Sequence, residues 1–176
     1  LQSYLDDARE KGAKIVEINP GNEDFSQQPH HKIPPTIVVN PTEDMKVMQE
    51  EIFGPILPIK SYKEVDDAIG YVNDHDRPLG LYYFGDDRAE ENRVINSTTS
   101  GGVAVNDVIT HIMQDDAPFG GVGPSGTGAY HGKEGFINFS HAKTVFRQTP
   151  FEFAAGALRP PYGEKTRKML AGIIKK

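Results

Sequence analysis

A stretch of six residues combines carboxylates, an aromatic ring and a backbone break: Glu50-Glu-Ile-Phe-Gly-Pro55. A carboxylate at the mouth of a strand can accept two hydrogen bonds from a ribose diol, and a phenylalanine can offer a flat apolar face to a heteroaromatic ring. Glu51 and Phe53 are therefore candidates for binding a nucleotide-like ligand. The alternative is an exposed glutamate followed by a core phenylalanine before a turn, and the local chemistry alone favours that alternative.

A second candidate region runs from Asn106 to a glycine-rich stretch, Pro118-Phe-Gly-Gly-Val-Gly-Pro-Ser-Gly126. So many glycines in an ordered loop indicate left-handed backbone or close backbone approach, and the alternative is a long surface turn. From Gly121 the loop matches the dinucleotide pattern G-x-G-x-x-G. That pattern requires a preceding strand, a helix opening at its third glycine and an acidic residue about 20 residues later. Pro124 interrupts the pattern and residues 137–151 hold no acidic residue, so we reject a phosphate site here.

Other common kinds of site lack support in the sequence. The six histidines lack metal-ligand spacing, and Ser125 has its preceding glycine one place too early for a nucleophile elbow. The absence of cysteine excludes a thiolate nucleophile, a disulfide and a cysteine-bound zinc within this chain, and is in keeping with the cytoplasm. The net charge of -6 argues against nucleic acid as the main ligand. No apolar run approaches the roughly 20 residues that cross a bilayer.

The elements that would position these residues alternate between strands and helices. β-Branched content and alternating apolar residues predict strands over residues 13–18, 36–40, 56–62, 81–84 and 102–106. Apolar spacing and capping signals predict helices ending at Gly12, over 65–72 and from Asp87 to Ile95, with short helices at 45–49 and 134–139. This order predicts an α/β fold with right-handed crossovers and a mostly parallel sheet.

Both ends of the sequence carry helical signals. The first residues share one helical stripe with no N-cap before them, so we expect the chain to begin inside a helix of a longer protein: Leu1, Tyr4, Leu5 and Ala8. A last strand is predicted at Lys143-Thr-Val-Phe-Arg-Gln148, and a basic amphipathic helix at residues 164–176. Membrane attachment through that helix is the weaker reading, because stable anchoring usually takes two signals.

Taken together, these motifs resemble the aldehyde dehydrogenase superfamily over essentially the whole chain. The run from Glu51 to Pro55 is similar to the cofactor motif of that superfamily, and residues 118–126 are similar to its late glycine-rich motif. Further runs are most similar to the branch with the class 3 and coniferyl aldehyde dehydrogenases: Val105-Asn-Asp-Val108, Gly128-Ala-Tyr-His-Gly-Lys133, Phe139-Ser-His141 and Tyr162-Gly-Glu-Lys-Thr-Arg-Lys168.

The resemblance implies a fold and a division of the chain. It implies the C-terminal part of the catalytic domain of such an enzyme, an α/β structure with a mostly parallel three-layer sheet and a C-terminal oligomerisation strand. Residues 1–141 would belong to the catalytic domain, residues 142–150 would form the oligomerisation strand, and residues 151–176 would form a tail with a helix.

The resemblance also implies a reaction, the oxidation of an aldehyde to a carboxylic acid. In the family a cysteine thiolate attacks the carbonyl, a hydride passes to the nicotinamide, and water activated by a glutamate hydrolyses the thioester. That cysteine and that glutamate lie upstream of the cofactor motif, so this chain would hold no catalytic residue and would be inactive alone. Glu51 would hold the nicotinamide ribose and Phe53 would lie by the nicotinamide ring. Asn106, Thr110 and Phe119 would lie near the substrate funnel.

Ligands and partners follow from the same resemblance. The cofactor would be NAD or NADP, with NAD favoured, and the substrate an aromatic aldehyde such as coniferyl aldehyde or a medium- or long-chain aliphatic one. Residues 143–148 would join a second copy in a homodimer, and the truncated domain would expose apolar surface and self-associate. The competing hypothesis is a non-catalytic binding or oligomerisation module derived from the same fold.

Overall fold

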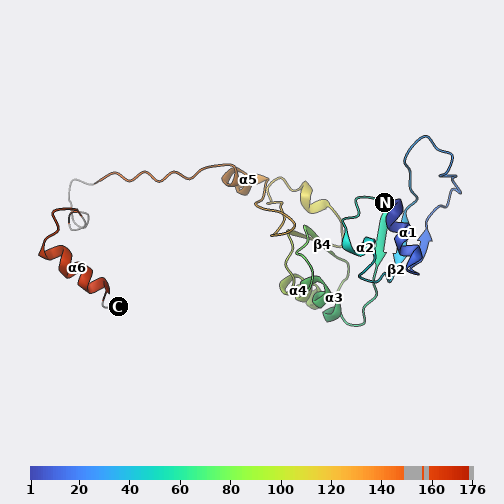
Figure 1. The fold of residues 1–176 in the computed structure, drawn as a ribbon, viewed down its shortest axis with the longest axis horizontal. Coiled ribbons are helices and arrows are strands. Elements are labelled where there is room, and N and C mark those ends of the chain that lie inside the picture. The colour runs from blue at the N-terminus through green and yellow to red at the C-terminus, as the bar shows by residue number, and fades with distance from the viewer. Residues whose placement is uncertain (149–155, 157–158, 175–176) are drawn as a thin grey trace.

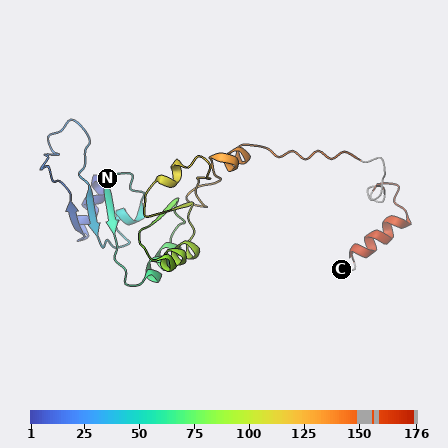
Figure 2. The same ribbon diagram turned by 180° about the vertical axis from the view of Figure 1, so that it is seen from behind.

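The N-terminal part of the chain folds around a three-stranded sheet in a computed structural model that describes residues 1–148, 156 and 159–174. The strands β1 (Lys14–Glu17), β2 (Thr36–Val39) and β3 (Ile56–Ile59) lie in that spatial order, with β1 antiparallel and β3 parallel to β2. Helix α1 (Gln2–Glu10) and the short α2 (Lys46–Gln49) lie beside this sheet (Figure 1). The long loop between β1 and β2 extends beyond the sheet in both views (Figure 2).

The core lies between α1 and this sheet. One face of β2 is buried through Thr36 and Val38, and it meets buried side chains from α1, from the region of α2 and from β3: Leu5, Ala8, Met45, Val47 and Ile56. Full burial of such apolar side chains contributes about 1.5–3 kcal/mol each. The helix α1 ends before Gly12, whose φ of 81° favours glycine, so the predicted stop is confirmed.

A second, two-stranded sheet follows. Strands β4 (Gly80–Tyr83) and β5 (Gly102–Val105) are parallel, and α3 (Val65–Asn73) and α4 (Arg88–Ser97) lie on one side of them (Figure 1). The N-cap of α4 is Asp87, as predicted, because its carboxylate accepts hydrogen bonds from two backbone N–H groups. Glu90 instead accepts a 3.0 Å hydrogen bond from the Tyr83 hydroxyl. Burial and this bond raise the pKa of Tyr83 to about 12.

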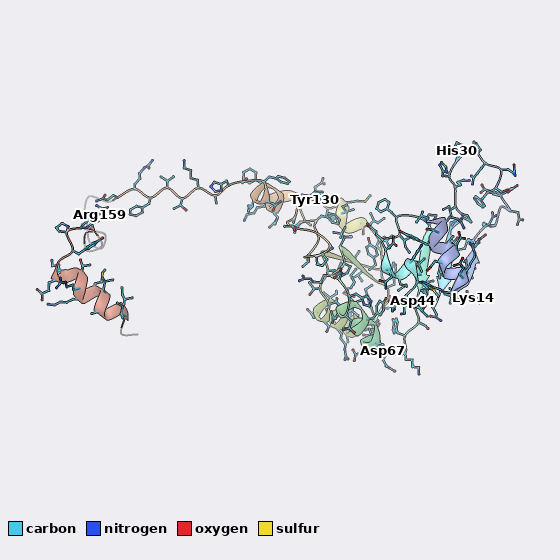
Figure 3. All side chains as sticks on the ribbon, viewed as in Figure 1. Lys14, His30, Asp44, Asp67, Tyr130 and Arg159 are labelled. Atoms are coloured by element: carbon cyan, nitrogen blue, oxygen red, sulfur yellow. The ribbon has the colours of Figure 1, made fainter. Side chains whose placement is uncertain are left out.

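The remaining elements lead away from the two sheets. A 3-10 helix, η1 (Thr110–Met113), follows β5, and α5 (Gly132–Asn138) follows the glycine-rich loop. After α5, residues 140–148 run away from the body as an extended segment, and the last described helix, α6 (Glu164–Ile174), is drawn far from both sheets (Figure 2). Tyr130, just before α5, marks the side on which the chain leaves the body (Figure 3).

The single three-layer sheet expected from the sequence is not present in the described residues, although the mixed α/β character is. The strands divide into two sheets, and β1 runs antiparallel to its neighbour. The chain returns from β1 to β2 through a loop rather than a helix, and antiparallel pairing does not need a crossover. The boundaries of the observed β-strands and α-helices lie within a few residues of the predicted ones, with β3 ending at Ile59 rather than residue 62, whereas the 3-10 helix at Thr110–Met113 was not predicted.

The predicted strand at residues 143–148 is not formed within this single chain. These residues are extended but form no ladder with a described strand, because the segment runs away from both sheets (Figure 1). The expected divisions at 142–150 and 151–176 fall partly on residues 149–155, 157–158 and 175–176, which lie outside the described residues.

Many large apolar side chains face solvent, including Phe53, Phe139 and Phe146, each more than four-fifths exposed. Apolar surface on this scale is uncommon on a protein that functions as an isolated monomer. Within the part of the chain that the structure describes, no helix has the length and apolar character needed to cross a membrane.

Candidate cofactor and substrate sites

The first candidate site is a tight turn between α2 and β3. The backbone N–H of Gly54 donates to the carbonyl of Ile52 at 2.9 Å, which makes Phe53 the central residue of a three-residue turn. Ile52 packs against the core beside α1, whereas the Phe53 side chain is 91 % exposed and Glu51 is also exposed. The reading of Phe53 as a core residue is therefore wrong, and the turn leaves a carboxylate and an aromatic ring free to meet a ligand.

Asn106 stands at the end of β5 with a left-handed backbone, φ 55°. Its side-chain Oδ1 accepts from the N–H of Gly85 at 2.9 Å, and its Nδ2 donates to the carbonyl of Gly85 at 3.0 Å. Asparagine tolerates this backbone region better than most residues. The Asn106 amide thus joins the ends of β4 and β5.

Phe119 lies in a cluster of aromatic rings at the base of the glycine-rich loop. Its backbone exchanges two 2.9 Å hydrogen bonds with Tyr130, and the two rings meet edge to face with centroids 5.5 Å apart. The ring of His111 lies 5.5 Å from Phe119 on another side, and His131 lies 6.4 Å from it. Phe119 therefore has three ring neighbours that fix its orientation.

The helix η1 and the residue before it lie beside this aromatic cluster. A cavity of about 190 Å³ lies between η1 and the start of β4, and its lining includes Ile109, His111 and Phe119. Both ring nitrogens of His111 are buried without a hydrogen-bond partner among the described residues. Ile109, the residue before η1, has a φ of 67°, which is unusual for a β-branched side chain. Strained backbone of this kind occurs preferentially at functional sites.

The glycine-rich loop is packed backbone against backbone. A Cβ on Gly101 would overlap the carbonyl oxygens of Gly120 and Leu79, and a Cβ on Gly120 would overlap that of Gly128. Gly123 has a φ of 64°. Both predicted roles of the glycines, close approach and left-handed backbone, are confirmed here.

The structure brings some of the predicted residues together and leaves others apart. Thr110 begins η1, and its neighbour His111 contacts the ring of Phe119. Glu51 and Phe53 sit on a different loop, beside the first sheet. The resemblance implied that the whole range 106–119 lies near the substrate funnel, but the sequence analysis singled out neither His111 nor Ile109. An isolated histidine and a β-branched residue in a loop give no signal of unpaired burial or left-handed backbone. In the described residues, no group of three or more acidic or histidine side chains is placed to hold a metal ion.

Comparisons of this chain with known proteins agree with one another on the family that it resembles. The sequence profile described as "Aldehyde dehydrogenase family" matches residues 1–145. The chain is 63% identical to a probable coniferyl aldehyde dehydrogenase of Caulobacter vibrioides over 100% of its own length and 36% of that protein. It is 50% identical to a coniferyl aldehyde dehydrogenase of a Pseudomonas species, covering 99% of this chain and 36% of that protein.

A solved structure agrees with this relationship. The crystal structure of a betaine aldehyde dehydrogenase double mutant from Staphylococcus aureus in complex with NAD+ is 31% identical, with a TM-score of 0.71, over 87% of this chain and 31% of that one. The chain therefore spans about a third of the length of the proteins that it matches.

Proposed function

Because the chain belongs to the aldehyde dehydrogenase family, we propose that it is part of an enzyme that oxidises an aldehyde to a carboxylic acid with NAD or NADP. The observation that carries this proposal is the turn at Phe53, which offers an exposed ring and, two residues earlier in the chain, the exposed carboxylate of Glu51. A nicotinamide cofactor supplies the hydride acceptor in such an oxidation. Other parts of the same protein supply the nucleophile, since this chain has no cysteine.

Each residue of the turn has a separate task. Glu51 accepts hydrogen bonds from a ribose diol, which holds the sugar in one orientation. Phe53 covers one side of the cofactor ring and excludes water from it. NAD is the preferred cofactor in this proposal, in keeping with the NAD+ in the related betaine aldehyde dehydrogenase structure.

The substrate is an aldehyde, with an aromatic aldehyde such as coniferyl aldehyde preferred over an aliphatic one of medium or long chain. Two of the relatives carry coniferyl aldehyde in their names. Phe119 lines the cavity at η1, Thr110 is the first residue of η1, and both form part of the substrate funnel in this proposal. Asn106 contributes by fixing the turn at the end of β5, since both polar atoms of its side chain are bonded to Gly85.

The test is an assay of the whole protein that contains this chain, with coniferyl aldehyde, benzaldehyde and a fatty aldehyde in the presence of NAD or NADP. Reduced cofactor is expected with at least one aldehyde, and Glu51→Gln is expected to raise the KM for the cofactor about tenfold, since a strong acceptor for the ribose is weakened. This chain alone is expected to give no turnover. No reduction with any aldehyde would favour the non-catalytic module instead.

The whole protein forms a homodimer in this proposal, through residues 143–148. This segment is extended and belongs to neither sheet, and its Val145 and Phe146 side chains are 66 % and 82 % exposed, so its main chain can join the sheet edge of a second copy. Val145→Pro removes one backbone donor and is expected to shift the light-scattering mass of the whole protein from dimer to monomer. A Lys143→Ala control should leave the dimer intact, and a V145P dimer would contradict this arrangement. A cytoplasmic location is part of the same proposal and is in keeping with the lack of cysteine.

A further inference from the structure

The helix α1 presents one polar stripe to the segment that leads to the cofactor turn. Tyr4, Asp7 and Lys11 are spaced by three and four residues, so they share one side of the helix. The Tyr4 hydroxyl donates to Oε2 of Glu50 at 2.6 Å, Oδ2 of Asp7 accepts from the N–H of Lys46 at 2.8 Å, and Nζ of Lys11 donates to the carbonyl of Asp44 at 2.5 Å. The stripe therefore holds residues 44–50 along their length.

The bond from Tyr4 reaches the residue directly before Glu51. Glu50 has extended backbone, φ -126° and ψ 152°, and in extended backbone successive side chains point to opposite sides. When the Glu50 side chain is held toward α1, Glu51 is directed away from the helix. The next residue, Ile52, is anchored by packing against the core. The direction of Glu51 is thus set on one side by a hydrogen bond and on the other by an apolar contact.

The start of α1 also lies against the far side of the turn. The Leu1 side chain occupies the space where a Cβ on Gly54 would lie. The helix therefore contacts the chain both before and after Phe53. Holding a binding loop in its bound conformation lowers the conformational entropy that a ligand must remove when it binds.

The bond between Tyr4 and Glu50 joins a hydroxyl to a carboxylate, a pairing that is stronger than one between two neutral groups. It lies at the exposed edge of the core, and Tyr4 itself packs against the buried side chains. The same hydrogen bond raises the pKa of Tyr4, so the hydroxyl stays protonated and remains the donor.

We propose that Tyr4 is a positioning residue of the cofactor site: through Glu50 it fixes the direction in which Glu51 presents its carboxylate to the cofactor ribose. This inference rests on the proposed function, because it takes Glu51 as the ribose ligand. It adds a residue that touches neither cofactor nor substrate and that lies on a helix remote in sequence from the cofactor motif.

The experiment uses the whole protein with Tyr4→Phe, which removes only the hydroxyl. Calorimetric titration with NAD is expected to show a dissociation constant raised about threefold to tenfold, the range expected for residues that act through a neighbour. The KM for NAD should rise in parallel, while kcat and the KM for the aldehyde stay within about twofold. Glu50→Gln keeps an acceptor oxygen and should retain most of the affinity, and Glu50→Ala should match Tyr4→Phe.

Further variants and readouts distinguish a positioning role of Tyr4 from a purely structural one. Tyr62→Phe, on an exposed tyrosine, should leave the dissociation constant unchanged. A double variant Tyr4→Phe/Glu50→Ala should bind NAD no more weakly than Glu50→Ala, because the two residues act through one bond. If Tyr4 served stability alone, the fraction of binding-competent protein would fall at an unchanged dissociation constant, and this would overturn the inference. A wild-type protein that neither binds nor reduces NAD or NADP would instead overturn the proposed function.

Discussion

The side-chain amide of Asn106 is bonded to both backbone groups of Gly85, one as acceptor and one as donor. Because Gly85 follows β4 and Asn106 follows β5, these two bonds continue the strand pairing past the point where the ladder ends. Asn106 and Gly85 therefore close the second sheet at the end where the chain leaves β5 and continues to η1.

Asn106→Gly should lower the free energy of unfolding of the whole protein by about 1–3 kcal/mol, because it removes both bonds and leaves the left-handed backbone unstrained. Asn106→Ala should lower it further, since alanine at a φ of 55° adds strain. Thermal or denaturant unfolding measures both. Asn92→Ala, an exposed position on α4, is the control and should change little. Equal stability of N106G and wild type would show that the two bonds contribute nothing.

Phe53→Ala in the whole protein should weaken NAD binding about tenfold, since an aromatic contact is worth about 0.5–1.5 kcal/mol. In this chain the ring is 91 % exposed and contributes little to folding, so the melting temperature without cofactor should stay close to wild type. Calorimetry and thermal unfolding give the two readouts. Phe136→Ala, on an exposed ring of α5, should leave the affinity for NAD as it is. An F53A protein with wild-type affinity would place the cofactor elsewhere.

The contacts of Asp7, a hydrogen bond from the backbone of α2 and an ion pair with Lys11, predict a pH dependence. The backbone N–H of Lys46 and the ammonium group of Lys11 lower the pKa of Asp7 from its ordinary 3.8. A carboxyl with a lowered folded-state pKa stabilises the fold above its unfolded value and loses that contribution as the pH falls through the folded value. The melting temperature of Asp7→Asn should therefore lie below that of wild type at neutral pH, and the gap should close as the pH falls below 3.8.

The control for this prediction is Asp6→Asn on the same helix. Asp6 is more exposed, and its contacts with Arg9 and Gln2 lie at the helix surface, so its removal should have little effect at any pH. Other carboxyls that lose protons in the folded state affect wild type and variant alike and cancel in the difference. A gap for D7N that stays constant below pH 3.8 would contradict the assignment.

His111→Leu should leave the stability of the whole protein unchanged or raise it by up to about 1 kcal/mol, because both ring nitrogens are buried without a partner among the described residues. His75→Leu is the matched comparison. Its Nδ1 lies 2.6 Å from the Tyr71 carbonyl, its ring stacks on Tyr71, and its Nε2 lies 3.6 Å from Glu43, so this change should be destabilising. A loss of more than about 1 kcal/mol in H111L would show that those nitrogens are hydrogen bonded in the protein.

The sequence predicted the local elements well where a physical signal repeats along the chain. The apolar spacing from Val65 to Val72 gave α3, and the acidic cap at Asp87 gave the start of α4. These features depend on residues close in sequence. The division of the strands into two sheets was not predicted, because β-branched content identifies a strand but does not show which strand it pairs with.

The sequence predicted which residues could form the candidate site better than it predicted how they are arranged. The pattern at Glu51 and Phe53 was recognised from the sequence. Whether Phe53 is exposed or buried depends on the tight turn closed by the hydrogen bond from Gly54 to Ile52, which the sequence alone does not specify. The partner of Glu50 lies 46 residues away on α1. The left-handed backbone of Ile109 runs against the preference of its side chain, so only the surrounding fold accounts for it.

The stacking of Gly101, Gly120 and Gly128 limits how this protein can be redesigned. Where carbonyl oxygens fill the place of a side chain, any substitution must displace backbone. These glycines offer a protein engineer no position at which to reshape the neighbouring cavity by small steps. Under the proposed function, we expect substrate preference to be altered instead through side chains that line the cavity, such as Ile109 and Ile112, which can change size without moving the loop.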